Sequence, residues 1–175
     1  MSQARPERIA TSVVTAAVLT LAGAAPAQAQ APLLRIQSLS LEGAVKVAAA
    51  ALADCRARGA VVAVAVVDRT GNLLALQRDP LAGMHTPDTA TRKAWTAVSF
   101  RGDTLSLEKA TGPDSPSNGI RYLPNVAMLG GGVPIEAAGS LVGAVGVSGA
   151  PSGEMDDACG KAGIGVIQDD LELGS

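Results

Sequence analysis

The chain has 175 residues, of which 47% are hydrophobic and 17% charged, so it is too apolar for a disordered chain and too short for two ordinary domains. A net charge of -2, a pI near 5.3 and only one Trp, one Tyr and one Phe argue against the basic, aromatic surface that binds nucleic acid. The core must therefore consist of small aliphatic side chains, and the modest area that such a subunit buries predicts a homo-oligomer.

The N-terminal residues have the pattern of an export signal. Arg5 and Arg8 precede an uncharged stretch over residues 9–25, and the small-x-small sequence at 27–29 is typical of a cleavage site. A retained membrane anchor is the alternative, but the stretch is short and glycine and proline interrupt it. We expect a periplasmic or secreted protein. Its expected parts, in chain order, are a signal peptide, a flexible segment and one folded domain (1–29, 30–38 and 39–170).

The rest of the chain alternates between helical and extended patterns. Apolar residues spaced three or four apart predict helices, and β-branched runs bounded by turn residues predict strands. Ser40 and Ser152 stand at helix N-cap positions, and Pro87 suits a first helical turn. The expected elements are a helix over 41–58, strands over 61–67 and 73–77, helices over 86–100 and 104–110, strands over 133–137 and 141–148, and a helix over 153–162.

Two short connections among these elements predict β-hairpins, and hence an antiparallel sheet. Helices grouped around such a sheet indicate an α+β, three-layer fold rather than a doubly wound parallel one. Residues 111–125 are rich in Pro, Ser, Asn and Gly, which predicts a surface loop. Its length suggests a functional or oligomer-contacting role, and a structural spacer is the favoured interpretation.

The two cysteines fall on the first and last of the predicted helices. Cys55 and Cys159 would form a disulfide if those helices were neighbours, because an exported protein meets an oxidising environment. Two buried free thiols are the alternative. The sequence leaves this choice open.

Five segments of the chain resemble the GlcG/HbpS family, in the family's order. They are VVDRTGNLL at 66–74, DTATRKAWTA at 88–97, GGGVPI at 130–135, VGAVGVSGA at 142–150 and DDACGKAG at 156–163. This resemblance implies a five-stranded antiparallel sheet flanked by helices, in a profilin-like layout shared with the C-terminal domain of PduO-type proteins. It also implies homo-oligomers, often octamers, together with haem binding, haem or iron handling and redox sensing.

The only histidine, His85, lies just before a predicted helix and is the candidate haem-iron ligand. Met84 beside it is a second ligand type that haem iron accepts, and Arg92 and Lys93 downstream would suit haem propionates. The alternatives are a solvated loop histidine and ordinary solvated helix charges.

Three acidic residues, Glu154, Asp156 and Asp157, open the last predicted helix. Their carboxylates would suit a hard cation such as iron. The favoured interpretation is that they complement the helix dipole without a metal.

The sequence lacks the residues that zinc binding, serine hydrolysis and dinucleotide binding require. A lone histidine does not make a zinc cluster, and the chain has no G-x-S-x-G nucleophile elbow. The glycines at 143–149 lie along a predicted strand and do not spell G-x-G-x-x-G, so we expect them to allow close packing. With the glycines at 130–132 they could instead wall a flat apolar cavity for a planar ligand.

The sequence thus predicts an exported haem-binding oligomer that sequesters or delivers haem and has no catalytic side chain. Any turnover would be slow haem degradation, in which iron supplies the reactivity. One alternative is a haem-free accessory protein of a catabolic operon that binds a small molecule. Another is a redox-sensing partner that acts through Cys55 and Cys159.

Overall fold

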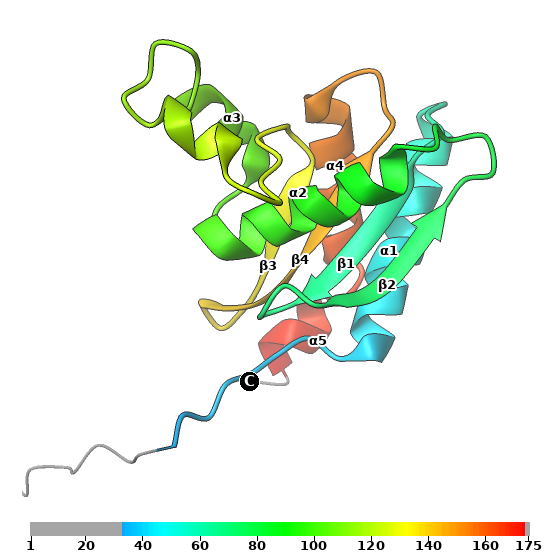
Figure 1. The fold of residues 1–175 in the computed structure, drawn as a ribbon. Coiled ribbons are helices and arrows are strands. Elements are labelled where there is room, and N and C mark those ends of the chain that lie inside the picture. The colour runs from blue at the N-terminus through cyan, green and yellow to red at the C-terminus, as the bar shows by residue number, and fades with distance from the viewer. Residues whose placement is uncertain (1–32, 174–175) are drawn as a thin grey trace, which may run out of the picture. The chain divides into compact units, whose positions relative to one another are not determined.

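The computed structural model describes residues 33–173, and one compact unit begins at Arg35 (Figure 1). The predicted signal peptide and the first part of the predicted flexible segment lie outside the described residues. Residues 33–40 carry no helix or strand. Within the described part of the chain, no helix is both long enough and apolar enough to span a bilayer.

The described residues form one four-stranded sheet in the order β2-β1-β4-β3, and all neighbouring strands are antiparallel. The strands are β1 (Ala63–Asp68), β2 (Leu73–Arg78), β3 (Gly132–Ala137) and β4 (Ser140–Ser148). The expectation of five strands is therefore wrong for this part of the chain. The extended segment before the first helix adds no strand, since Leu39 N donates to Val142 O at 2.9 Å without further ladder pairing.

Helices cover both faces of this sheet, so the α+β, three-layer prediction is confirmed (Figure 1). One face packs against α1 (Leu41–Ala57) and α4 (Gly153–Gly165), and the other packs against α2 (Thr86–Phe100). The remaining helices are α3 (Thr104–Ala110), the 3-10 helix η1 (Asn118–Tyr122) and α5 (Gln168–Leu173).

The two central strands have different side chains on their two faces. On β1, Val64 and Val66 join the large core under α1 and α4, whereas Ala63 and Ala65 pack beside Ala90 of α2. Small side chains on the α2 side let that helix approach the sheet closely, and the valines on the other side fill the main core. Because of this alternation, polar side chains of α2 can reach the end of β4.

Local signals predicted most element bounds to within two or three residues. Ser40 caps α1 and Ser152 caps α4, each by accepting a hydrogen bond from a first-turn backbone N–H. The structure extends α4 beyond the predicted end at 162 to Gly165. Gly163 suggests a helix end, but a Cβ there would lie 2.7 Å from Val47 O of α1, so close packing explains this glycine. The sequence also missed α5 and η1.

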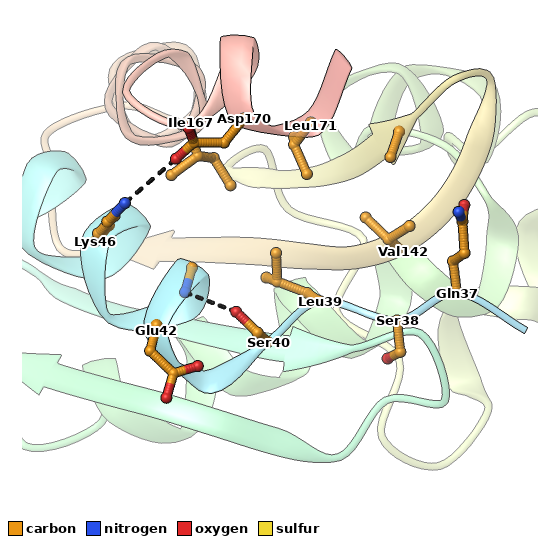
Figure 2. A pocket seen from close by; sticks show the side chains of 12 residues that line it. Gln37, Ser38, Leu39, Ser40, Glu42, Lys46, Val142, Ile167, Asp170 and Leu171 are labelled. Atoms are coloured by element: carbon orange, nitrogen blue, oxygen red, sulfur yellow. Dashed lines mark hydrogen bonds and ion pairs between the residues drawn. The ribbon is translucent and has the colours of Figure 1, made fainter. Parts of the chain in front are cut away.

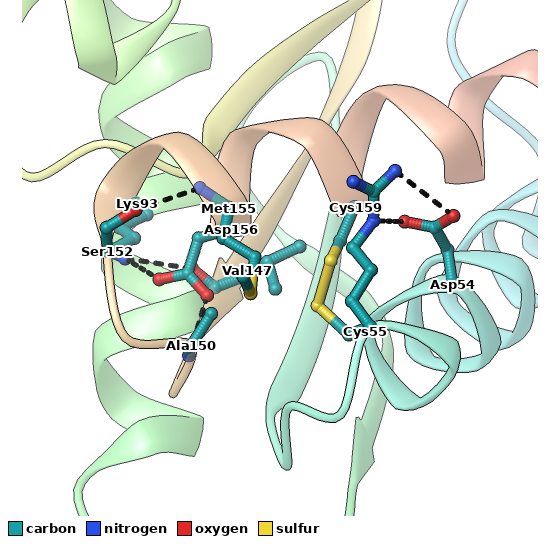
Figure 3. The surroundings of a disulfide bond; sticks show 10 residues. Asp54, Cys55, Lys93, Val147, Ala150, Ser152, Met155, Asp156 and Cys159 are labelled. Carbon is teal, nitrogen blue, oxygen red and sulfur yellow. Dashed lines mark hydrogen bonds and ion pairs between the residues drawn. A yellow bond between two sulfur atoms is a disulfide. The ribbon is translucent and has the colours of Figure 1, made fainter.

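The helices that carry the two cysteines are neighbours, and Cys55 and Cys159 form a disulfide with a Cα–Cα distance of 5.5 Å (Figure 3). Both residues are fully buried. The bridge therefore joins α1 to α4 inside the main core, and the alternative of two free thiols is wrong for this structure.

Candidate functional site

A pocket of about 460 Å³, here called the His85 pocket, lies where α2 and α4 begin. Its wall includes the chain after β4, which turns sharply at Gly149 (φ 129°), and the loop before β3, which passes Gly130. Backbone forms much of this wall because neither glycine carries a side chain. The polar groups at the pocket come from His85, Thr86, Thr89, Lys93, Glu108, Ser148, Ser152 and Asp156.

His85 stands at the N-cap position of α2 and is exposed at the pocket. Its ring lies against Gly83, where a Cβ would be 2.7 Å from His85 Cε1, so the glycine leaves room for the imidazole. The backbone carbonyl of His85 accepts a bond from Thr89 N at 3.1 Å, which holds the residue to the first turn of the helix. Within the described residues neither ring nitrogen has a hydrogen-bond partner, so the imidazole is free to bind a metal.

Two turns along α2, Lys93 is buried and also lines the pocket. Its ammonium donates to Val147 O at 2.9 Å and to Asp156 Oδ2 at 2.8 Å. The other oxygen of Asp156 accepts from Ala150 N at 3.0 Å. Burial raises the pKa of the Asp156 carboxyl, although Lys93 partly offsets this effect. The pair therefore joins α2, β4 and α4 behind the pocket.

The four residues predicted for haem binding have different surroundings. His85 and Lys93 line the same pocket, but Met84 is 94% exposed and does not line it. Arg92 lines an adjacent hollow of about 280 Å³ together with Arg121 of η1. The two cavities share Thr89 and Leu129, so Arg92 borders the His85 pocket from the next cavity.

The three acidic residues at the start of α4 do not come together around one point. Asp156 binds Lys93, whereas Asp157 Oδ2 pairs with Lys161 at 2.6 Å. Bonds from its own backbone N–H and from Ser152 hold the pKa of Glu154 below its usual value, as expected for a residue at a helix start. Among the described residues no group of three or more His, Cys, Asp or Glu side chains could hold a metal ion. Two of the three carboxylates are therefore paired with lysines, and Glu154 has the surroundings of a residue at a helix start.

Glycines on the α2 face of the sheet serve close packing, as expected from the sequence. A Cβ on Gly146 would overlap the backbone carbonyl of Ala90 and lie 2.6 Å from Ala94 N. A Cβ on Gly132 would likewise overlap the backbone carbonyl of Lys93. These two positions are therefore occupied by α2 and leave no room for a planar ligand, whereas Gly130 and Gly149 do line the His85 pocket.

Sequence reasoning missed Glu108 of α3. Its Oε2 accepts a bond from Gly130 N at 2.9 Å, which fixes the loop before β3 and places the carboxylate at the pocket. No motif marks this residue, because the interaction joins positions 22 apart whose approach depends on the loop between them.

A further hollow of about 360 Å³ lies between the start of α1 and α5 (Figure 2). Leu39, Val142 and Leu171 are among its apolar lining residues, and Lys46 and Asp170 form an ion pair of 3.2 Å at its edge. None of the predicted site residues lines it.

The His85 pocket meets the basic requirements of a haem site. An imidazole with two unpaired ring nitrogens stands at its edge, and an arginine stands in the adjacent cavity. Its volume falls within the range of small-molecule sites in proteins, roughly 300–1,000 Å³. The residues present thus fit haem in two respects, a histidine for the iron and an arginine for a propionate.

Fold and pocket together define a small α+β protein with an open pocket between the starts of two helices. The chain belongs to the HbpS-like family, because the family model described as "Haem degrading protein HbpS-like" matches residues 39–165.

Similar proteins agree with this assignment. A crystal structure of a double mutant of HbpS from Streptomyces reticuli has 40% sequence identity and a TM-score of 0.74, over 82% of this chain and 97% of that one. The crystal structure of a PduOC:heme complex has 29% identity and a TM-score of 0.70, over 74% and 95% of the two chains. An uncharacterized 15.0 kDa protein of Citrobacter freundii from the dhaT-dhaS intergenic region is 33% identical over 117 residues, which cover 66% of this chain and 82% of that protein.

Proposed function

We propose that this protein binds haem in the His85 pocket and that His85 is the axial ligand of the haem iron. The observation that carries the proposal is the unpaired imidazole at the edge of an open pocket, in a chain with no other histidine. Family membership and a structural neighbour with bound haem support it. Bound haem would supply an iron centre capable of redox chemistry.

The chain's own residues would orient such a ligand. Gly83 leaves room for the imidazole, and the first turn of α2 holds the backbone of His85. Arg92 is half exposed, and its one ion pair among the described residues, with Asp88, is 3.4 Å long and solvated, so its guanidinium can turn to a propionate. Lys93 is unsuited to that role because Asp156 and Val147 already accept its hydrogen bonds.

The cellular role that we propose is an exported protein that sequesters or delivers haem as a homo-oligomer, such as an octamer. Exposed apolar side chains, including Leu76, Leu81 and Leu129, support association of subunits. Slow haem degradation and redox sensing are further properties proposed for it. The buried disulfide argues that any sensing acts through haem rather than through accessible thiols.

A hemin titration of the purified protein followed by absorption spectroscopy tests the proposal. We expect a saturable Soret shift, and His85→Ala should change the spectrum and weaken binding by at least tenfold. Met84→Ala is the matched control, because Met84 is adjacent in sequence but does not line the pocket. Arg92→Gln should weaken binding a few-fold without a change in the Soret position.

Two results would contradict this assignment. If His85→Ala binds hemin like the wild type, His85 is not the ligand. If no variant and no wild-type sample shows a saturable shift, the haem-free accessory role replaces haem binding. Size-exclusion chromatography of the same samples measures the oligomer.

A further inference from the structure

A separate hollow of about 240 Å³, here called the Trp95 pocket, lies at the other end of α2. The β1–β2 turn, the last turns of α2 and the start of β4 form its walls. It shares no lining residue with the His85 pocket or with the Arg92 cavity. The haem proposal therefore leaves it without a role.

Two guanidinium groups line this pocket, and neither has a carboxylate partner among residues 33–173. Arg69 donates from Nη1 to Leu141 O at 3.0 Å, which fixes its side chain across the pocket. The side chain of Arg101 has no hydrogen bond or ion pair within the described part of the chain. None of the described residues that line the pocket is acidic. Two permanent positive charges thus share one small cavity without a counter-charge.

The acidic residue next to Arg69 in sequence is already engaged. The oxygens of Asp68 accept bonds from Thr70 N at 2.7 Å, from Asn72 N at 2.9 Å and from Asn72 Nδ2 at 3.0 Å. These bonds close the β1–β2 turn. Asp68 therefore serves the hairpin rather than neutralising the arginines.

The indole of Trp95 adds a further donor and a flat apolar surface. Its edge lies against Gly71, where a Cβ would be 2.8 Å from Trp95 Cδ1 and 3.1 Å from Nε1. The indole is half-buried, and within the described residues its N–H has no acceptor. A hydroxyl from Ser99 also lines the pocket, so most of its polar side-chain groups are hydrogen-bond donors.

Arg101 occupies its place at a conformational cost. It ends α2 with φ 52° and ψ 44°, a left-handed conformation in which glycine is the usual residue. The negative end of the helix dipole accounts for one cation at this position. It does not account for the second, Arg69, which comes from a strand turn.

We propose that the Trp95 pocket binds a small anion through carboxylate or phosphate oxygens, with Arg69 and Arg101 as the recognising groups. Guanidinium groups match such oxygens by paired, charge-assisted hydrogen bonds. The pocket has about half the volume of the His85 pocket, so its ligand is smaller than a porphyrin. This site goes beyond the haem proposal and holds or fails independently of it.

Trp95 is the only tryptophan of the chain, so its fluorescence reports on this pocket directly. Purified haem-free protein is titrated with inorganic phosphate and, separately, with succinate, at constant ionic strength set by chloride. We expect a saturable change for at least one of them. Arg69→Gln and Arg101→Gln should each weaken it more than about tenfold, since each removes charge-assisted bonds. Lys109→Gln, which removes an exposed charge outside the pocket, should bind like the wild type.

Arg101→Gly keeps the test valid if Arg101→Gln fails to fold. Glycine relieves the left-handed backbone, so we expect a melting temperature a few degrees higher together with lost anion binding. No saturable change in the wild type, or equal changes in all variants, overturns the proposal. A change of oligomer size in the arginine variants without any anion effect also overturns it, and assigns the pocket to a contact between subunits.

Discussion

The ammonium of Lys93 on α2 lies 2.8 Å from a carboxylate oxygen of Asp156 on α4, and only 5% of each side chain is exposed. Each group therefore depends on the other, because an unpaired charge at this depth would be strongly unfavourable. The pair also connects α2 and α4, the two helices that begin at the His85 pocket (Figure 3).

Lys93→Met should lower the free energy of unfolding by about 3–5 kcal/mol, because it leaves Asp156 buried without its partner. Urea denaturation measures this loss. The double variant Lys93→Met, Asp156→Leu should lose less than the sum of its single variants. Arg92→Met is the control next in sequence, and it should cost under about 0.5 kcal/mol since its pair is solvated. Equal effects at 92 and 93 would argue against a buried pair.

The disulfide should contribute substantially to stability, since it closes a loop with a sequence separation of 104. We expect the double variant Cys55→Ala, Cys159→Ala to lose about 2–5 kcal/mol in guanidinium denaturation. The matched chemical check is a thiol assay of unreduced wild-type protein in denaturant. It should detect no free thiol, and two thiols per chain would show that the bridge is absent.

Gly146→Ala should displace α2 from the sheet, because the new Cβ would meet the helix backbone rather than a movable side chain. The expected loss is about 1–3 kcal/mol or more in urea denaturation. Gly165→Ala at the end of α4 is the control, since nothing lies within 4 Å of a Cβ there. An effect at 146 no larger than at 165 would mean that α2 does not rest on β4 as closely as described.

Asp68 should make the free energy of unfolding depend on pH in the acid range. Burial alone would raise the pKa of its carboxyl, but the bonds from Asn72 and Thr70 outweigh burial and hold that pKa below its usual value. A depressed pKa contributes stability above the unfolded-state value, and this contribution disappears as the pH falls through the folded-state pKa.

Asp68→Asn should therefore be less stable than the wild type by about 1 kcal/mol at pH 7, and the difference should shrink below pH 3.8. Urea midpoints at pH 7, 4 and 3 measure it. Asp114→Asn, at an exposed loop position, should match the wild type throughout. A difference at position 68 that stayed constant down to the lowest pH would contradict the assignment.

Local chemistry in the sequence was enough to predict helices α1 to α4 and most strand bounds. Ser40 and Ser152 cap α1 and α4 by bonds that span three residues. A run rich in β-branched residues is enough to predict β1 from the local sequence. The close-packing role of Gly146 was also predictable, because a glycine within a strand has few other uses.

Tertiary structure decided which neighbours in sequence face the interior. Met84 and His85 are adjacent, yet only the histidine lines the pocket, and Arg92 is solvated while Lys93 is buried. The reason is that burial of Lys93 depends on Asp156, 63 residues away, and no local pattern contains that partner. No local pattern decides the pairing of the cysteines or the absence of a fifth strand among the described residues either, since each depends on which elements pack together.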